Sequence, residues 1–276
     1  MDRERIIVSF TSWGKRFCNI PYVLDTIFNQ SLPPDIVVLN LNDDEITPKN
    51  VNEYLNSHNV IVNRIPYKKV FKKLIPTLKL YPDDCIINID DDWLYPPTMI
   101  EDLWNTHLKY PNNPISGNRE FINGYTCHCG CASLTKASFF DNLELIDQDL
   151  MEHCPSDDAV YTYFAIRSGH PYLWAKELYY TNMQPYNSIE SYSPSDSILD
   201  AVGITWQYLI SRFGDIQPLD ELLIQDKMIL NILQRKNKLE ISKAIIEGRS
   251  SVRSSMAYKT GNLLLKPFSW ISNLIS

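Results

Sequence analysis

The order of apolar and polar positions predicts alternating strands and helices over the first part of the chain. Four short apolar runs rich in β-branched residues are expected to form buried strands: residues 6–10, 35–41, 60–62 and 85–89. Helical spacing between them predicts three further segments: a helix starting at Asn19 or in the loop before it, a helix over residues 51–57, and a helix or turn over residues 74–80. This alternation indicates an α/β domain with a mostly parallel central sheet and flanking helices.

The pattern is less regular in the middle of the chain, but one more helix is predicted over residues 156–169. Ser156 is placed to cap its N-terminus, because a serine hydroxyl accepts from the first free backbone N–H groups. Asp157 and Asp158 fall in the first turn, where the helix dipole favours negative charge. These two carboxylates either only stabilise the N-terminus of the helix or take part in catalysis there.

The C-terminal part of the chain has its own pattern and its own charge. Residues 220–247 carry apolar positions at helical spacing, so we expect a long helix there. From Asp226 onward the sequence contains nine basic and three acidic residues, a net charge of about +6. Because the whole chain has a net charge of −7, the part before Asp226 carries about −13. We therefore expect an α/β domain over residues 1–215 and a basic helical extension over residues 216–276.

Polar residues follow three of the predicted strands directly. Thr11 follows the first, Asn42 the second, and Asp90, Asp91 and Asp92 the fourth. Because parallel strands present their carboxyl ends at one edge of the sheet, where ligands bind, we expect these residues to share one site.

The three consecutive aspartates suggest a metal site. Adjacent carboxylates at the end of an apolar strand repel one another and resist desolvation, and a divalent cation removes that cost. If the strand stays extended, Asp90 and Asp92 point to one side and Asp91 to the other. Such a pair of oxygen ligands suits Mg²⁺ or Mn²⁺ shared with substrate phosphates. The alternative interpretation is a solvated acidic turn.

Composition and charge narrow the class of protein. The chain has 276 residues, 44% of them apolar and 21% charged, as in an ordinary globular protein. The acidic body argues against nucleic acid as a partner. The basic C-terminal part, with residues 262–275 rich in Leu, Ile, Phe and Trp, suits peripheral contact with an anionic membrane face. A helix docked on protein explains the same residues equally well.

Six cysteines raise the questions of compartment and metal. We see no secretory signal and no run of 18 apolar residues, so we expect a cytoplasmic protein with reduced thiols. Cys127, Cys129 and Cys131 alternate along the chain and would form a zinc site with Cys154 or His153. A strand of small side chains is the interpretation we favour, because structural zinc sites usually space their paired ligands further apart.

Several of these segments, taken in order, resemble a known family. Thr11-Ser12-Trp13-Gly14-Lys15-Arg16 follows an apolar strand, residues 20–31 end in a Gln-Ser pair, and Asp90-Asp91-Asp92 is a DxD-type motif. Pro155-Ser156-Asp157-Asp158 then opens a helix that ends at Gly169. Over residues 5–180 the chain is similar to family-2-like GT-A glycosyltransferases, of the kind that build bacterial surface or capsular polysaccharides.

The resemblance implies a role for each matching residue. It implies a GT-A nucleotide-diphospho-sugar transferase fold over residues 1–215, with a nucleotide-sugar half over about 1–95 and an acceptor half over about 96–215. The residues it assigns to the nucleotide-sugar are Thr11, Trp13, Arg16, Asn42, Asp90 and Asp91. Asp92, with Asp90, would ligate Mn²⁺ or Mg²⁺. Asn42 stands where many members have the Asp that recognises the base.

Catalysis is then expected at the start of the later helix. Asp158 would be the general base that deprotonates an acceptor hydroxyl, and Asp157 is the alternative. Direct displacement with such a base inverts the anomeric centre. Lys72 or Lys73 would face the donor phosphates, or both lie in a solvated basic turn.

The sequence thus predicts a metal-dependent, inverting glycosyltransferase. It would move a sugar from a nucleoside-diphosphate-sugar donor to a glycan or lipid-linked acceptor in surface polysaccharide biosynthesis. Two alternatives stay open: a metal-dependent phosphohydrolase that uses the aspartates, and a non-catalytic nucleotide-sugar-binding protein.

Overall fold

A computed structural model of the chain describes residues 4–66, 70–117, 121–122, 125–175, 184–186 and 198–216. The chain divides into two units, Met1–Leu219 and Asp220–Ser276, and the described residues all belong to the first. The helix expected over residues 220–247 and the apolar segment 262–275 lie outside the described residues. The proposed domain boundary therefore stays a prediction.

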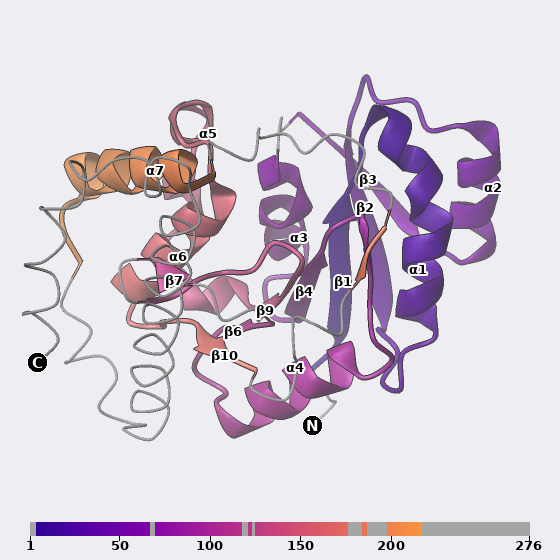
Figure 1. The fold of residues 1–276 in the computed structure, drawn as a ribbon, viewed down its shortest axis with the longest axis horizontal. Coiled ribbons are helices and arrows are strands. Elements are labelled where there is room, and N and C mark those ends of the chain that lie inside the picture. The colour runs from indigo at the N-terminus through magenta and orange to yellow at the C-terminus, as the bar shows by residue number, and fades with distance from the viewer. Residues whose placement is uncertain are drawn as a thin grey trace, which may run out of the picture. The chain divides into compact units, whose positions relative to one another are not determined.

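A seven-stranded sheet forms the centre of the described part, in the order β10-β6-β9-β4-β1-β2-β3 (Figure 1). The strands are β1 (Ile6–Thr11), β2 (Ile36–Asn42), β3 (Ile61–Ile65), β4 (Cys85–Ile89), β6 (Ile115–Ser116), β9 (Ala132–Thr135) and β10 (Leu173–Trp174). All neighbours pair in parallel except β9, which runs antiparallel between β4 and β6. The mostly parallel α/β sheet expected from the sequence is confirmed.

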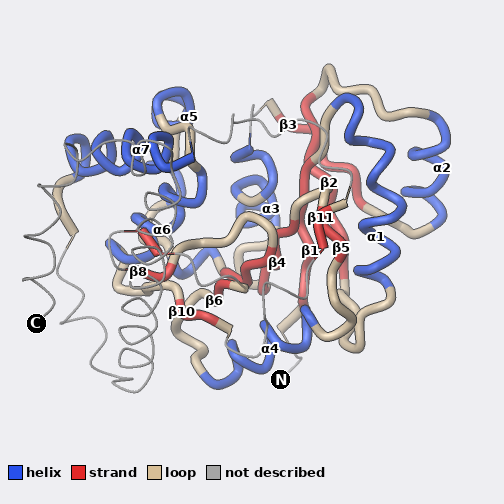
Figure 2. The backbone as a smooth tube through the Cα atoms, in the orientation of Figure 1, coloured by secondary structure: helices blue, strands red, loops and turns tan. Residues whose placement is uncertain are grey.

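Helices lie on both faces of this sheet (Figure 2). The α-helices are α1 (Ile20–Phe28), α2 (Lys49–Ser57), α3 (Ile75–Leu80), α4 (Met99–Lys109), α5 (Gln148–His153), α6 (Asp157–Arg167) and α7 (Ile198–Phe213). Short segments of 3-10 helix are η1 (Gly14–Asn19), η2 (Val70–Lys73), η3 (Ala137–Phe139) and η4 (Leu143–Leu145). Two short ribbons complete the fold: β5 (Trp93–Leu94) with β11 (Gln184–Pro185), and β7 (Phe121–Ile122) with β8 (Tyr125–Thr126).

Alternate residues of β1 face the two layers. Ile6, Val8 and Phe10 are fully buried in an apolar core that includes residues of α1, α2 and α4. Ser9 points the other way, where its hydroxyl contacts the Lys73 carbonyl at 2.5 Å and the Thr77 hydroxyl at 2.6 Å. Because side chains alternate along a strand, this register sets η2 and α3 against the second face of the sheet.

The polar contacts on that second face hold the sheet and η2 in register. Asn40 in β2 donates to the hydroxyls of Ser9 and Thr77 at 3.1 and 2.9 Å. Each of these polar side chains is fully buried, so each requires a partner in the interior. The network fixes the position of Lys73, the last residue of η2, relative to the end of β1.

The helix predicted over residues 156–169 is confirmed as α6. Ser156 caps it, since its Oγ accepts from the Ala159 N–H at 3.2 Å. Asp157 and Asp158 lie in its first turn, as expected. Within the described residues, no helix has the length and apolar character needed to cross a bilayer.

Candidate functional site

The end of β4 carries the three aspartates, and Arg16 meets two of them. Arg16 Nη2 contacts Asp91 Oδ1 and lies 2.9 Å from Asp92 Oδ2. Arg16 comes from η1, the turn that follows β1, and β1 pairs directly with β4. Neighbouring parallel strands therefore bring the Thr11–Arg16 loop to the acidic cluster.

The extended run expected through Asp92 is not seen. The chain turns at Asp91 and Asp92, so both carboxylates face Arg16, while Asp90 faces Lys73. The turn is held by the buried phenol of Tyr95, which accepts from the Asp90 N–H at 2.9 Å and donates to the Asp90 carbonyl at 3.2 Å. The strand therefore ends at Ile89, and none of the three aspartates continues it.

Lys73 joins the first acidic cluster to the second. Its Nζ lies 3.2 Å from Asp90 Oδ1 and 3.3 Å from Asp157 Oδ2. The side chain is buried, which by itself would lower its pKa, but the carboxylates of Asp157, Asp90 and Asp158 raise the pKa well above the usual value. Lys73 is therefore a permanent cation between the end of β4 and the start of α6.

Gly130 allows this convergence. A Cβ added there would collide with Lys73 Nζ, and would lie 3.2 Å from Asp158 Oδ1 and 3.6 Å from Asp90 Oδ2. Asn88 in β4 holds the loop in place by donating to the carbonyls of Cys129 and Gly130 at 3.1 and 2.7 Å. Asp158 and Asp90, 68 positions apart in the chain, thus flank the same point.

His128 lies next to Asp158 and carries no charge. Its Nε2 is 3.9 Å from Asp158 Oδ1, and its Nδ1 is 2.9 Å from the Tyr172 hydroxyl. Complete burial lowers the pKa of the imidazole well below its usual value, and the nearby Lys73 lowers it further. The neutral ring therefore adds no positive charge beside Asp158.

Negative charge exceeds positive charge across the site. Three carboxylates after β4 and two at the start of α6 face the cations Arg16 and Lys73, which leaves about three negative charges in excess when all are ionised. Burial raises the pKa of Asp91 to about 6, against the lowering effect of Arg16. Burial and the Asp90 charge raise the pKa of Asp92. A cation at this place would relieve both effects.

A second polar group surrounds Asn42 at the end of β2. Glu45 accepts from the Asn42 N–H at 2.7 Å and from Lys72 Nζ at 2.6 and 2.7 Å. Arg64 donates to the carbonyls of Asn42 and Glu45 at 2.8 and 2.5 Å. Lys72 and Lys73 are adjacent in the chain, yet they point to different groups, and both are buried. The solvated basic turn is therefore excluded for this pair.

The loop after β1 lies between these two groups. Thr11 donates to the Asn40 carbonyl at 2.8 Å, which fixes it beside β2, and Trp13 is half-buried just before η1. The segment Gln184–Tyr186 also reaches the aspartates. Its β11 pairs with β5, and the Tyr186 N–H donates to the Asp92 carbonyl at 2.7 Å.

The cysteine-rich segment is a connection and not the strand we expected. Residues 127–131 link β8 to β9, because Asn88 and Ser133 bind the backbone that a strand would pair. Among the described residues, side chains with the spacing of metal ligands are found elsewhere. They are Glu4, Cys85 and His107. The zinc interpretation of Cys127, Cys129 and Cys131 therefore gains no support.

Comparison with known proteins finds similarity in the fold but no match at the level of family models or curated sequences. No family model matches the chain, and no curated protein matches it either. Among solved structures, the chain is similar to a mannosyltransferase from Pyrobaculum calidifontis in complex with GDP-Man and Mn²⁺. The alignment covers 94% of this chain and 83% of the mannosyltransferase, with a TM-score of 0.53 and 14% sequence identity. The fold is of the GT-A type.

Another GT-A-like structure is more distant. Glucosyl-3-phosphoglycerate synthase from Mycobacterium tuberculosis, in complex with Mn²⁺, UDP and glucosyl-3-phosphoglycerate, aligns with 78% of this chain and 82% of its own. The TM-score is 0.47 and the identity 13%.

Within the GT-A fold, the residues singled out from the sequence fall into two groups. Those gathered at one point are Arg16, Lys73, Asp90, Asp91, Asp92, Asp157 and Asp158. Those beside the end of β2 are Thr11, Asn42 and Lys72, while Trp13 lies in the loop after β1, just before η1. Gly130, His128, Glu45 and Arg64 were missed, since each reaches its group through a fold contact that has no local signal in the sequence.

Proposed function

We propose that this protein is a metal-dependent glycosyltransferase that moves a sugar from a nucleoside-diphosphate-sugar donor to an acceptor hydroxyl. The observation that carries the proposal is the convergence of the two acidic motifs, in which Lys73 contacts both Asp90 and Asp157 while Asp158 and Asp90 flank Gly130. A donor-binding motif and a base-bearing motif within one site are what sugar transfer requires.

The residues after β4 suit a hard divalent cation. Asp92 and Asp90 would hold Mn²⁺ or Mg²⁺, since such ions are usually bound by one or two carboxylates and completed by substrate phosphates and water. Asp91 Oδ2 is a buried carboxylate oxygen without a hydrogen-bond partner among the described residues, which suits a role in this shell. When bound, the cation would neutralise charge on the leaving diphosphate.

The two carboxylates at the start of α6 differ in exposure, which supports different roles for them. The Asp157 side chain is 10% exposed and ion-paired to Lys73, so it holds the lysine in place. The Asp158 side chain is 37% exposed and is therefore open to an acceptor. Asp158 would take the proton of the attacking hydroxyl as the new glycosidic bond forms and the bond to the diphosphate breaks, which inverts the anomeric centre.

The group around Asn42 would meet the nucleoside. Ligands of parallel α/β sheets sit beyond the carboxyl ends of the strands, and Thr11, Asn42 and Lys72 lie there next to the acidic cluster. Arg16, at the junction, would bind the diphosphate once it is released from Asp91 and Asp92. The similar mannosyltransferase was solved with GDP-Man and Mn²⁺, which agrees with a diphosphate-sugar donor.

The acceptor we propose is a glycan or a lipid-linked sugar in surface polysaccharide biosynthesis, with peripheral membrane contact through the basic C-terminal part. The support is the resemblance of residues 5–180 to polysaccharide glycosyltransferases and the positive charge that follows Asp226.

A turnover assay tests the proposal. The protein is incubated with a panel of nucleoside-diphosphate sugars, Mn²⁺ and oligosaccharide or lipid-linked acceptors, and glycosylated product is detected by mass spectrometry. Asp158→Asn is expected to reduce turnover by about 10²- to 10⁴-fold while nucleotide binding is kept. Asp141→Asn, an exposed acid outside the site, is the matched control and should leave turnover unchanged.

Three results would argue against this function. Release of inorganic phosphate without sugar transfer would favour a phosphohydrolase. Metal-dependent nucleotide binding without turnover on any donor would favour a binding protein. Equal turnover in Asp158→Asn and wild type would remove Asp158 from the chemistry.

A further inference from the structure

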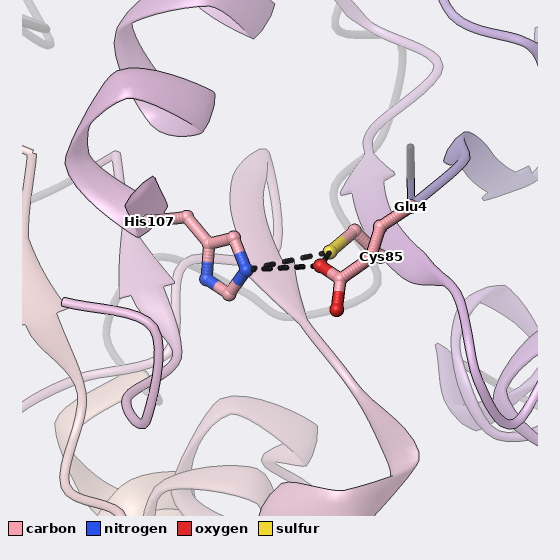
Figure 3. A group of neighbouring side chains, drawn as sticks. All are labelled: Glu4, Cys85 and His107. Carbon is pink, nitrogen blue, oxygen red and sulfur yellow. Dashed lines mark hydrogen bonds and ion pairs between the residues drawn. The ribbon is translucent and has the colours of Figure 1, made fainter. Parts of the chain in front are cut away.

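A second group of chemically active side chains lies at the opposite end of β4 from the aspartates. Glu4, Cys85 and His107 point toward one another there (Figure 3). Cys85 is the first residue of β4, whereas Asp90 follows its last, so about 16 Å of strand separates the two places. Nothing in the proposed sugar transfer uses these three residues.

The distances between their donor atoms match the edges of a metal-centred tetrahedron. Glu4 Oε2 lies 3.3 Å from Cys85 Sγ, His107 Nε2 lies 3.4 Å from Glu4 Oε2, and His107 Nε2 lies 3.6 Å from Cys85 Sγ. Zinc bonds of about 2.3 Å to sulfur and about 2.0–2.1 Å to nitrogen and oxygen, at tetrahedral angles, place such atoms about 3.3–3.6 Å apart. The three donors are therefore already spaced for one ion.

Contacts outside the three donor atoms also hold these residues in place. The Cys85 N–H donates to the Arg5 carbonyl at 3.0 Å, which fixes Glu4 beside the start of β4. Lys136 contacts the other carboxylate oxygen, Glu4 Oε1, at 2.6 Å, so Oε2 is the oxygen turned toward the thiol and the imidazole. His107 comes from the last turn of α4. Three chain segments distant in sequence thus supply one ligand each.

The burial of two of the three side chains suits a metal ion bound inside the protein and not one attracted to its surface. Cys85 and His107 are almost fully buried, while the Glu4 side chain is 43% exposed and gives an ion a way in. His107 Nδ1 has no hydrogen-bond partner among the described residues, so the polar contacts of the ring are on the Nε2 side, facing the other two donors.

We propose that Glu4, Cys85 and His107 bind one Zn²⁺ ion, with a water molecule as the fourth ligand. The mixed sulfur, nitrogen and oxygen donor set selects zinc over the hard cations suited to the aspartates. On binding, the Cys85 thiol gives its proton to solvent and the thiolate forms the bond to the metal. The ion would tie the start of β1, the start of β4 and the end of α4 together.

Cobalt substitution tests this site without any assay of activity. The full-length protein is stripped with a chelator, titrated with Co²⁺ under reducing conditions, and followed by the thiolate-to-cobalt charge-transfer absorption, which carboxylate-only sites lack. We expect one equivalent of Co²⁺ to give the band, and one equivalent of Zn²⁺ to displace it. The same band is expected in Asp92→Asn, so failure of the proposed sugar transfer leaves this test intact.

Three variants decide the ligands. Cys85→Ser is expected to abolish the band, and Glu4→Gln, an exposed change that does not threaten the core, to weaken Co²⁺ binding at least tenfold. Cys129→Ser is the matched control, since Cys129 is buried beside Cys131 at a different place, and should keep the band. Absence of the band in wild type, or its persistence in Cys85→Ser, would overturn the proposal, as would unchanged binding in Glu4→Gln.

Discussion

The ammonium of Lys73 lies 3.3 Å from the carboxylate of Asp157, and this ion pair joins the turn after β3 to the start of α6. The same ammonium lies 3.2 Å from Asp90. Residues 73, 90 and 157 come from three separate chain segments, so the two acidic motifs are one site because a single buried lysine contacts both.

Lys73→Met is expected to destabilise the fold by about 3–5 kcal/mol, because it leaves Asp90 and Asp157 without their shared cation in a buried place. Lys79→Met is the control: its ion pair with Glu144 is largely exposed and should contribute about 1 kcal/mol or less. Urea unfolding of both variants measures the difference. Equal stabilities of the two variants would show that the Lys73 contacts do not hold the site together.

Asp91 should make the metal-free protein less stable as pH rises. Its pKa is raised from 3.8 to about 6 by burial, so between pH 4 and pH 6 the folded state holds a proton that the unfolded state has lost. Above pH 6 the buried charge costs roughly 3 kcal/mol. In chelator, the stability of Asp91→Asn relative to wild type should therefore increase by about this amount from pH 4 to pH 8. A constant difference between the two proteins across this range would contradict the raised pKa.

Gly130→Ala is expected to impair turnover with little loss of stability. Gly130 does not have a positive φ, so an alanine there causes no backbone strain. The new methyl group acts instead by displacing Lys73 and crowding Asp158. A displacement of about 1 Å at such a place reduces turnover by about 10²-fold. Gly203→Ala in α7, where a Cβ meets nothing within 4 Å, should keep full activity and gain about 0.5–1 kcal/mol. Equal turnover in the two variants would place Gly130 outside the site.

The sequence predicted the part of the fold that depends on local pattern. The first, second and fourth strands are mainly apolar runs, and the structure has β1, β2 and β4 there within one residue at each end. The start of α6 could be predicted from Ser156 and the two aspartates that follow it, because helix capping depends on residues adjacent in the sequence. The order of these elements was enough to place Asp90 and Thr11 at one edge of the sheet.

What the sequence did not predict depends on contacts between distant segments. The turn at Asp91 is imposed by the Tyr95 phenol, and the split between Lys72 and Lys73 is set by Glu45 on one side and Asp157 on the other. The place of Gly130 next to Lys73 depends on Asn88, which holds a loop 41 positions away. None of these contacts has a periodicity or a motif that a single sequence displays.

A thermal-shift screen of nucleoside diphosphates with and without Mn²⁺ tests most directly whether the acidic residues form one metal-dependent nucleotide site. At ligand about 100-fold above Kd, we expect at least one nucleotide to raise the Tm by about 5–10 °C, with Mn²⁺ required. Asp92→Ala should lose the shift, and Asp141→Ala should keep it. No shift with any nucleotide, or the same shift in Asp92→Ala as in wild type, would contradict a metal-bound donor at this site.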